Sequence, residues 1–303
     1  MAYTMPQHFN SIEQALVSLF GNNIKIEAAD QIFGGDINDA YKLTLTDGTC
    51  IFMKSNTIKN ASFFSAEAAG IDAISRTGAI RTPQIFCSGT EKSGNGYSFL
   101  LMEFIEKKKC AKNYWETFAQ ELAAMHQAKT TDFVKGGTYG FIQDNFIGAS
   151  HQKNTAHDSW ISFFRSCRLT PQFNRASHYF DASGRKSITY LLDHLEDILV
   201  EPEHPSILHG DLWSGNFITG NDGKAWLIDP AVYVGHAEAD LAMTELFGGF
   251  PPAFYDAYQE AAPMQPGYHH RRDLYNLYHM LNHLNLFGPY YLSLARRMIR
   301  KYT

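Results

Sequence analysis

The sequence predicts an α+β chain of two lobes, a strand-rich first lobe at residues 1–106 and a mainly helical second lobe at residues 107–303. The first hundred residues consist mostly of strand-like apolar runs, one of which, Tyr41–Thr46, alternates between apolar and polar side chains as a half-buried strand does. After Glu106 the apolar side chains recur at three- and four-residue steps, which is the stripe of a core-facing helix. The 303 residues, 45% of them hydrophobic, suffice for one large core or two lobes.

The first lobe begins with a predicted β-hairpin. Apolar and polar residues alternate over Tyr41–Thr46, and Asp47-Gly48 offers the positive φ angles of a tight primed turn before the next strand. The segment "FFSAEAAGIDAI" (63–74) has helical spacing and is the one helix expected in the first hundred residues. The segments "PQIFCSG" (83–89) and "YSFLLMEFI" (97–105) are predicted strands.

The second lobe follows a connection near residues 104–110. Its first helix is indicated by Trp115, Phe118, Leu122 and Met125, which fall on one helical face. Further helix-like segments are residues 160–169, 188–200, 239–250 and 271–287. The stretch "ILHGDLWSGNFITGNDGKAWLIDP" (207–230) is the main strand-like segment among them.

Composition excludes several classes of partner. The formal net charge is −5, and the one basic run, Lys107–Lys109, is typical of a solvated connector, so we expect no nucleic-acid partner. No stretch approaches eighteen consecutive apolar residues, and the N-terminus lacks the basic and apolar regions of a signal peptide. Four separate cysteines (50, 87, 110 and 167) without a C-x-x-C pair favour reduced thiols. We therefore expect a soluble, cytoplasmic protein without a membrane partner.

The 207–230 stretch contains a candidate catalytic motif. His209, Asp211 and Asn216 have the spacing H-x-D-L-x-x-x-N of a kinase catalytic loop, and Asp229 closes the hairpin that follows. Transfer of a phosphoryl group to a hydroxyl needs a carboxylate that orients the O–H and accepts its proton, which would be Asp211. It also needs oxygen ligands for Mg²⁺, which Asn216 and Asp229 would supply.

The alternative interpretation is that these residues only form turns. Asp, Asn and Gly are turn formers, and we assign Asn221, Asp222 and Gly223 to a hairpin turn without chemistry. By chance alone, His, Asp and Asn would have this spacing in on the order of a few of every hundred chains of this length. The motif therefore needs partners elsewhere in the sequence.

Two such partners are present in the first lobe. Lys54 ends the third strand-like run and Glu67 lies on the helix after it, in the order that a phosphate-binding lysine and its acidic partner require. A lysine at a strand end is often only a solubilising charge. Its coincidence with the downstream motif favours a nucleotide-binding role for both residues.

The remaining nucleotide contacts are indicated by position. Gly34 and Gly35 lie between the first two strands, where a loop covering the phosphates of ATP would lie, although a plain β-turn explains them equally well. No helix opens on these glycines, which argues against a Rossmann site. The backbone of Glu103, Phe104 and Ile105, in the connection between lobes, could hydrogen-bond adenine.

Four strings together resemble a known family. "LHGDLWSGN", "WLIDPAVYVGHAEADLAMTELFGGFP", "WISFFRSCRLTPQ" and "LNHLNLFG" are similar to the fructosamine kinase (ketosamine 3-kinase) family, from about residue 20 to the C-terminus. The resemblance implies a two-lobed protein-kinase-like fold, related to aminoglycoside and choline kinases. It also implies ATP-dependent phosphorylation of the 3-hydroxyl of a ketosamine, free or protein-bound, followed by breakdown of the adduct. The implied role is deglycation.

The resemblance also implies individual roles. Asp211 would be the base, Asn216 and Asp229 the metal ligands, and Lys54 with Glu67 the nucleotide clamp. Trp213 and His283 would contact the ketosamine, although a core aromatic and a satisfied helix histidine are the alternatives. Asp240 would brace the catalytic loop, and His209 would be structural.

One residue departs from the family. Asp36 stands in the glycine turn where other members can carry a cysteine, so a redox switch through that loop is not expected. Two other functions stay open: a kinase for an aminoglycoside, choline or homoserine, and a pseudokinase scaffold. A pseudokinase usually lacks the base, a metal ligand or the lysine, and this chain keeps all of them.

Overall fold

The structure is a computed structural model that describes residues 7–33, 37–94 and 96–303. The chain divides into two compact units. The first unit comprises Met1–Tyr114 together with Ile218–Asp229, and the second comprises Trp115–Phe217 together with Pro230–Thr303. Each unit therefore joins segments that are far apart in the sequence.

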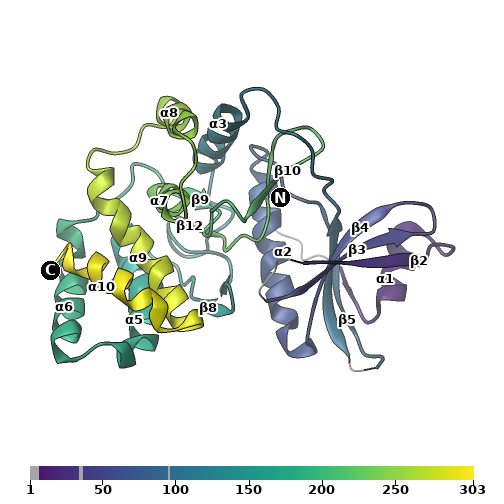
Figure 1. Cartoon of the computed structure of the whole chain (residues 1–303), viewed down its shortest axis with the longest axis horizontal. Helices are drawn as coiled ribbons and strands as arrows, with labels where there is room; N and C mark the ends of the chain where they lie inside the picture. Colours follow the sequence, from purple (N-terminus) through teal and green to yellow (C-terminus); the bar gives the residue numbers. More distant parts are fainter. Residues whose placement is uncertain (1–6, 34–36, 95) are drawn as a thin grey trace. The chain divides into compact units, whose positions relative to one another are not determined.

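A six-stranded sheet forms the centre of the first unit (Figure 1). Its strands lie in the order β1-β5-β6-β4-β3-β2, and all neighbours are antiparallel except β1 and β5. The strands are β1 (His8–Phe9), β2 (Ile26–Ile32), β3 (Asp39–Leu45), β4 (Cys50–Asn56), β5 (Ile85–Glu91) and β6 (Tyr97–Glu103). The strand predictions for the first lobe are confirmed.

The hairpin of β3 and β4 is confirmed, but its turn differs from the predicted one. The amide of Leu45 donates to the carbonyl of Thr49, and the amide of Gly48 donates to the carbonyl of Leu45, each at 2.8 Å. Only Gly48 has a positive φ, of 84°, whereas a primed two-residue turn of type I′ would need two. The loop is therefore a longer one in which the glycine alone takes the left-handed conformation.

Two helices cover opposite faces of the sheet. Phe99 and Leu101 of β6 pack in one core cluster with α1 (Ile12–Phe20), whereas Leu100 and Met102 pack with α2 (Ala61–Arg76). Successive side chains of a strand point to opposite faces, so the two helices lie on either side of β5 and β6 (Figure 1). The expectation of a single helix in the first hundred residues is wrong, because α1 is also present.

The predicted boundary at residue 106 also differs from the observed division. Residues 107–114 and 218–229 contribute to the first unit, and the latter include most of the hairpin of β10 (Phe217–Thr219) and β11 (Ala225–Leu227). Backbone hydrogen bonds explain this: Lys108 donates to Thr219 at 3.1 Å, Ala111 to Gly223 at 3.0 Å, and Leu227 to the carbonyl of Arg81 at 2.9 Å. A segment from the middle of the second predicted lobe thus pairs with the first.

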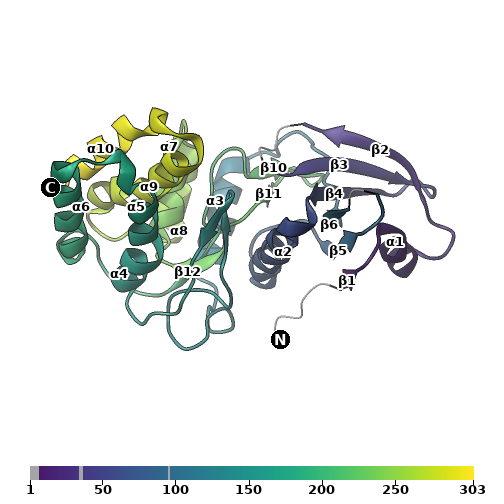
Figure 2. The ribbon, with the colours of Figure 1, turned by 90° about the horizontal axis from the view of Figure 1, so that it is seen from below.

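Helices dominate the second unit (Figures 1 and 2). They are α3 (Tyr114–His126), α4 (Trp160–Phe163), the π-helical turn η2 (Phe164–Leu169), α5 (Thr170–Arg175), α6 (Ala182–Asp193), α7 (Glu238–Leu246), α8 (Pro252–Ala261), α9 (Tyr268–Phe287) and α10 (Leu292–Arg300). Two short strand pairs accompany them, β7 (Asn145–Ile147) with β8 (Ser150–Gln152), and β9 (Ser206–Leu208) with β12 (Tyr233–Gly235). The mainly helical character predicted for this part of the chain is confirmed.

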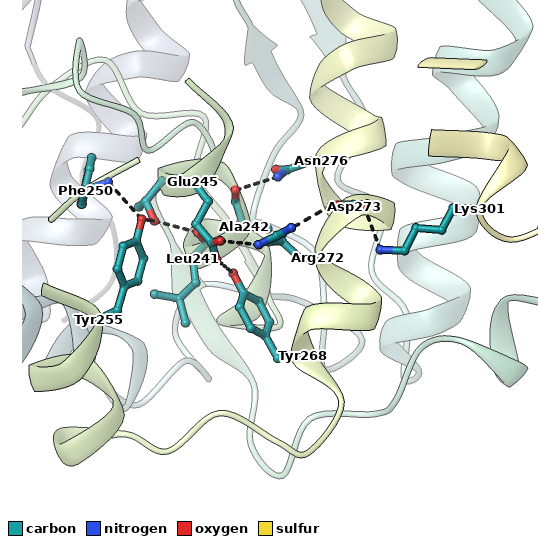
Figure 3. A network of polar contacts seen from close by, with 11 residues as sticks. Leu241, Ala242, Glu245, Phe250, Tyr255, Tyr268, Arg272, Asp273, Asn276 and Lys301 are labelled. Atoms are coloured by element: carbon teal, nitrogen blue, oxygen red, sulfur yellow. Dashed lines mark hydrogen bonds and ion pairs between the residues drawn. The ribbon is translucent and has the colours of Figure 1, made fainter. Parts of the chain in front are cut away.

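A polar network holds α7 against α9 (Figure 3). The carboxylate of Glu245 on α7 accepts hydrogen bonds from Tyr268 and Arg272 of α9, each at 2.6 Å. One turn further along α9, Asn276 donates to the carbonyl of Ala242 at 2.8 Å. These bonds fix the relative position of two helices that carry residues of the candidate site. In the described part of the chain, no helix combines the length and apolar character needed to cross a bilayer.

Candidate active site

The first unit contains a buried cluster of one ammonium and two carboxylates. Lys54 on β4 pairs with Leu100 of β6 and therefore points to the face that α2 covers. Its ammonium donates to Oε1 of Glu67 on α2 at 2.6 Å and to the carboxylate of Asp229. The sheet register and the helix thus bring together three residues that are up to 175 positions apart.

Burial and mutual contact shift the pKa values in this cluster. Burial by itself would lower the pKa of Lys54, but the charges of Asp229 and Glu67 outweigh it and raise that pKa, so the ammonium stays charged. Burial raises the pKa of the Glu67 carboxyl, and the nearby charge of Asp229 adds to that effect. The cluster thus offers two carboxyl groups for one ammonium, and carboxylate oxygens are the ligands that a divalent cation such as Mg²⁺ prefers.

Asp229 has an unusual backbone. It follows β11 by two residues and has a φ of 56°, the left-handed region that L-residues rarely adopt. Its side chain is 45% exposed, although its carboxylate contacts the buried Lys54. Backbone strain of this kind concentrates at functional sites, where the surrounding structure maintains it.

The structure shows fewer contacts for the other residues that are predicted to bind the nucleotide. Gly34, Gly35 and Asp36 lie outside the described residues. Glu103 is the last residue of β6, and its amide donates to the carbonyl of Gln84 at 2.8 Å. Phe104 and Ile105 follow outside any strand, and the ammonium of Lys42 lies 5.1 Å from the centre of the Phe104 ring.

In the second unit, Asp240 holds the backbone of the predicted catalytic loop. Its buried carboxylate accepts the amides of His209 at 2.6 Å and Gly210 at 2.8 Å. The ring of His126 contacts the same carboxylate at 3.2 Å and bonds the hydroxyl of Tyr258 at 2.7 Å on its other side. Burial alone would raise the pKa of Asp240, but the contacts with His126, His209 and Gly210 lower it, so Asp240 is ionised.

Gly210 allows the chain to turn directly before Asp211. Its φ is 81°, and a Cβ atom at this position would lie 2.1 Å from the carbonyl oxygen of Ala231. The amide of Ala231 in turn donates to the carbonyl of His209 at 2.8 Å. His209 is fully buried, and its ring accepts the amide of Asp211 at 3.3 Å. The loop therefore packs tightly against the segment that leads into β12.

Asn216 orients the candidate base. Its side-chain amide donates to the backbone carbonyl of Asp211 at 2.8 Å and to Oδ2 of the Asp211 carboxylate at 3.0 Å. Both bonds use the nitrogen of Asn216, which leaves its carbonyl oxygen as a hard ligand for a cation. No group of three or more His, Cys, Asp or Glu side chains that could hold a metal ion occurs among residues 7–33, 37–94 and 96–303. Mg²⁺ does not require one, because it commonly takes one or two protein ligands together with phosphate oxygens.

Sequence reasoning missed His279 of α9. Its Nδ1 lies 3.8 Å from Oδ1 of Asp211, on the opposite carboxylate oxygen from the one that Asn216 bonds. His279 is 4% exposed, and burial lowers its pKa to about 3, so its ring is neutral. Asp211 and His279 are 68 positions apart, and no local motif links them.

Trp213 and His283 belong to one group of aromatic side chains. Phe247, at the end of α7, stands between them, with ring centres 6.0 Å from Trp213 and 5.2 Å from His283. The structure therefore connects both predicted substrate contacts through a residue that the sequence did not single out. The predicted turn at Asn221 and Asp222 is confirmed, and Asp222 accepts the amide of Lys224 at 3.1 Å.

Comparison with known proteins relates this geometry to an enzyme family. Residues 8–303 match the family model described as fructosamine kinase. A chloroplastic protein-ribulosamine 3-kinase from Oryza sativa subsp. indica is 40% identical over 289 residues, covering 93% of this chain and 80% of the rice protein.

Solved structures show the same fold. A candidate fructosamine-3-kinase from Haemophilus somnus 129PT has a TM-score of 0.84 and 30% identity, covering 96% of each chain. A thermostable aminoglycoside phosphotransferase, solved with AMP-PNP and hygromycin B, has a TM-score of 0.63 at 15% identity, covering 97% of this chain and 99% of that one. The predicted two-lobed, protein-kinase-like α+β fold is therefore confirmed.

Proposed function

Because the chain belongs to the fructosamine kinase family, we propose that it transfers the γ-phosphoryl group of ATP to the 3-hydroxyl of a ketosamine. The substrate class is the ketosamines, which form when a sugar glycates an amine. The rice relative, named a protein-ribulosamine 3-kinase, supports both the class and the position of the phosphate.

The observation that carries this proposal is that the structure holds the Asp211 carboxylate in one orientation. The side chain of Asn216 donates a hydrogen bond to Oδ2 of this carboxylate. The two residues before Asp211 donate their backbone amides to the ionised Asp240, which holds the loop in place. A carboxylate held in one position can align the 3-hydroxyl for in-line attack and accept its proton as the O–P bond forms. Asp240 and His209 act on this step only by keeping the loop in place.

Lys54 supplies the positive charge for the nucleotide. Held by Glu67, its ammonium would contact the α- and β-phosphates of ATP, and the backbone at Gly34 and Gly35 would cover them. The peptide groups from Glu103 to Ile105 would bind adenine, since Phe104 and Ile105 lie outside the sheet hydrogen bonds.

Asn216 and Asp229 would hold Mg²⁺. Each supplies an oxygen of the kind this ion prefers, an amide carbonyl and a carboxylate. When bound, the ion would neutralise charge on the phosphates. The contact of Lys54 with two carboxyl groups, those of Glu67 and Asp229, supports this assignment, since it leaves carboxyl oxygens next to the proposed phosphate site.

The proposed biological role is deglycation of amines or proteins, because a 3-phosphate next to a ketone makes the adduct prone to elimination. All four cysteines (Cys50, Cys87, Cys110 and Cys167) are free, which is consistent with the reducing cytoplasm that we propose as its location.

A substrate panel tests this function. We expect ADP release with ribulose-, erythrulose- or fructose-derived adducts of Nα-acetyl-lysine, and none above background with kanamycin, choline or homoserine. Turnover of one of the latter compounds alone would show a different small-molecule kinase. Absence of any phosphoryl transfer, with ATP still bound, would show a nucleotide-binding scaffold.

A further inference from the structure

Five aromatic rings form a continuous strip in the second unit. The aromatic strip consists of Trp213, Phe247, His283, Phe287 and Tyr291. Ring centres are separated by 6.0 Å from Trp213 to Phe247, 5.2 Å from there to His283, and then 5.5 Å to Phe287 or 5.1 Å to Tyr291. Each ring thus contacts the next without an interruption.

The aromatic strip is exposed although it is apolar. Trp213 is 37% exposed, Phe247 39% and Phe287 54%. Scattered exposed aromatics are ordinary, but a contiguous group of them on a folded unit typically marks a binding surface. Four of the five residues carry no ionisable group that is charged at neutral pH, and the fifth is His283, whose pKa burial lowers.

One end of the aromatic strip adjoins the candidate base. Trp213 follows Asp211 by two residues, and the ring of His279 lies 3.8 Å from the Asp211 carboxylate. His279, His283 and Phe287 are spaced by four residues on α9, so they share one face at steps of about 6 Å along the helix. The strip therefore leads away from Asp211 along α9.

His283 presents a hydrogen-bond acceptor in this row. Its Nδ1 donates to the carbonyl of His279 at 2.8 Å, which fixes the tautomer with the proton on that nitrogen. The ring is neutral, because burial lowers its pKa. Nε2 therefore keeps a lone pair that can accept an N–H bond.

The chemistry of a ketosamine matches this order of groups. Its nitrogen is separated from the 3-oxygen by three carbon atoms, so a 3-hydroxyl bound to Asp211 places the nitrogen a few ångströms away. The nitrogen is a secondary ammonium at neutral pH, which an aromatic face attracts and which donates N–H bonds. The rest of the amine then continues beyond it, away from the base.

We propose that the aromatic strip binds the amine half of the substrate, a secondary ammonium followed by an extended aliphatic stem such as that of a lysine side chain. This inference rests on the proposed function and adds the part of the substrate that selects among amines. Trp213 and His283 would contact the ammonium, and Phe247, Phe287 and Tyr291 the methylene groups of the stem.

The test compares ribulose adducts of hexylamine and methylamine, which share the sugar and the charge and differ only in the stem. For the wild-type enzyme we expect a KM for the hexylamine adduct about tenfold below that for the methylamine adduct, since each additional methylene group buries apolar surface. In Phe287→Ala the KM values for the two adducts should become nearly equal, whereas Phe287→Tyr should keep the wild-type difference. Trp213→Ala should raise the KM for both adducts and leave that for ATP unchanged.

Tyr190→Ala is the matched control, because Tyr190 is 50% exposed on α6 and lies outside the aromatic strip. It should keep the wild-type ratio of the two KM values. Equal KM values for both adducts in the wild-type enzyme, or an unchanged ratio in Phe287→Ala, would overturn the assignment of the strip. Absence of turnover with either adduct would overturn the proposed function itself, and the assignment with it.

Discussion

Nδ1 of His279 lies 3.8 Å from Oδ1 of Asp211 and has no hydrogen-bond partner within the described ranges of the chain. The contact joins the middle of α9 to the predicted catalytic loop. A charged imidazole would form a strong ion pair here, but burial lowers the pKa of His279 to about 3. Asp211, the proposed base, is therefore next to a neutral, dipolar neighbour rather than a cation.

The low pKa of His279 predicts a pH dependence of stability. Above the ordinary histidine value of about 6.5 the ring is neutral in both the folded and the unfolded chain. Below it the unfolded chain binds a proton that the folded chain excludes, so this contribution to stability falls as the pH decreases from about 6.5 towards about 3. The free energy of unfolding should be measured in urea between pH 7 and pH 5. Its slope against pH should be smaller in His279→Gln than in the wild type, by up to about 1.4 kcal/mol per pH unit. Equal slopes for the two proteins would contradict it.

Removal of Lys54 should have separable effects on stability and activity. Lys54→Met leaves the carboxylates of Glu67 and Asp229 without their cation and should lower the free energy of unfolding by about 3 kcal/mol. Adding Glu67→Gln should restore much of the stability but none of the ATP-dependent turnover. Lys59→Met, at an exposed lysine, is the control for both measurements. Full activity in the double variant would contradict the assigned role of Lys54.

Gly210 can be tested against a glycine of the same conformation. Gly210 and Gly136 have φ values of 81° and 79°, but only at Gly210 would a Cβ atom meet another group, the carbonyl of Ala231 at 2.1 Å. Both alanine variants should lose about 1 kcal/mol from backbone strain. Gly210→Ala should also lower kcat, because the loop before Asp211 must shift. Equal kcat values in the two variants would show that the loop tolerates the movement.

Asp211→Asn tests the base. The amide keeps the size of the carboxylate but cannot accept the proton of the 3-hydroxyl, so we expect ketosamine-dependent ADP release to fall by about 10² to 10⁴ while the Kd for ATP stays unchanged. Asp222→Asn, in the hairpin turn of the same stretch, should retain turnover. Near-normal turnover by Asp211→Asn would show that Asp211 is not the base.

Local patterns in the sequence predict much of this site. The spacing of Asp211 and Asn216 reflects one loop, in which the Asn216 amide reaches back five residues to bond Asp211, so it is visible without a structure. The order of Lys54 and Glu67 reflects a strand followed by a helix. One local signal was missed: Ser11 caps α1 by accepting the amide of Gln14 at 3.1 Å, and the Ser-x-x-Gln pattern that accompanies such caps stands in the sequence.

Other features depend on tertiary packing and leave no local pattern. His279 and Phe247 acquire their places only when α7 and α9 pack together, through bonds such as that from Asn276 to Ala242. The hairpin of β10 and β11 joins the first unit because its backbone bonds residues near 108 and 81, which no periodicity predicts. The sequence therefore indicates the candidate reacting groups more readily than the neighbours that set their environment.

The position of the transferred phosphate tests the central claim most directly. The product of the best ketosamine substrate should be analysed by ³¹P and ¹H NMR before it decomposes. We predict that the phosphorus couples to the proton on carbon 3 of the ketosamine, and that phosphate and free amine appear as the signal decays. A phosphate on any other oxygen, or a stable product that keeps its amine, would contradict the assignment of the chain as a ketosamine 3-kinase.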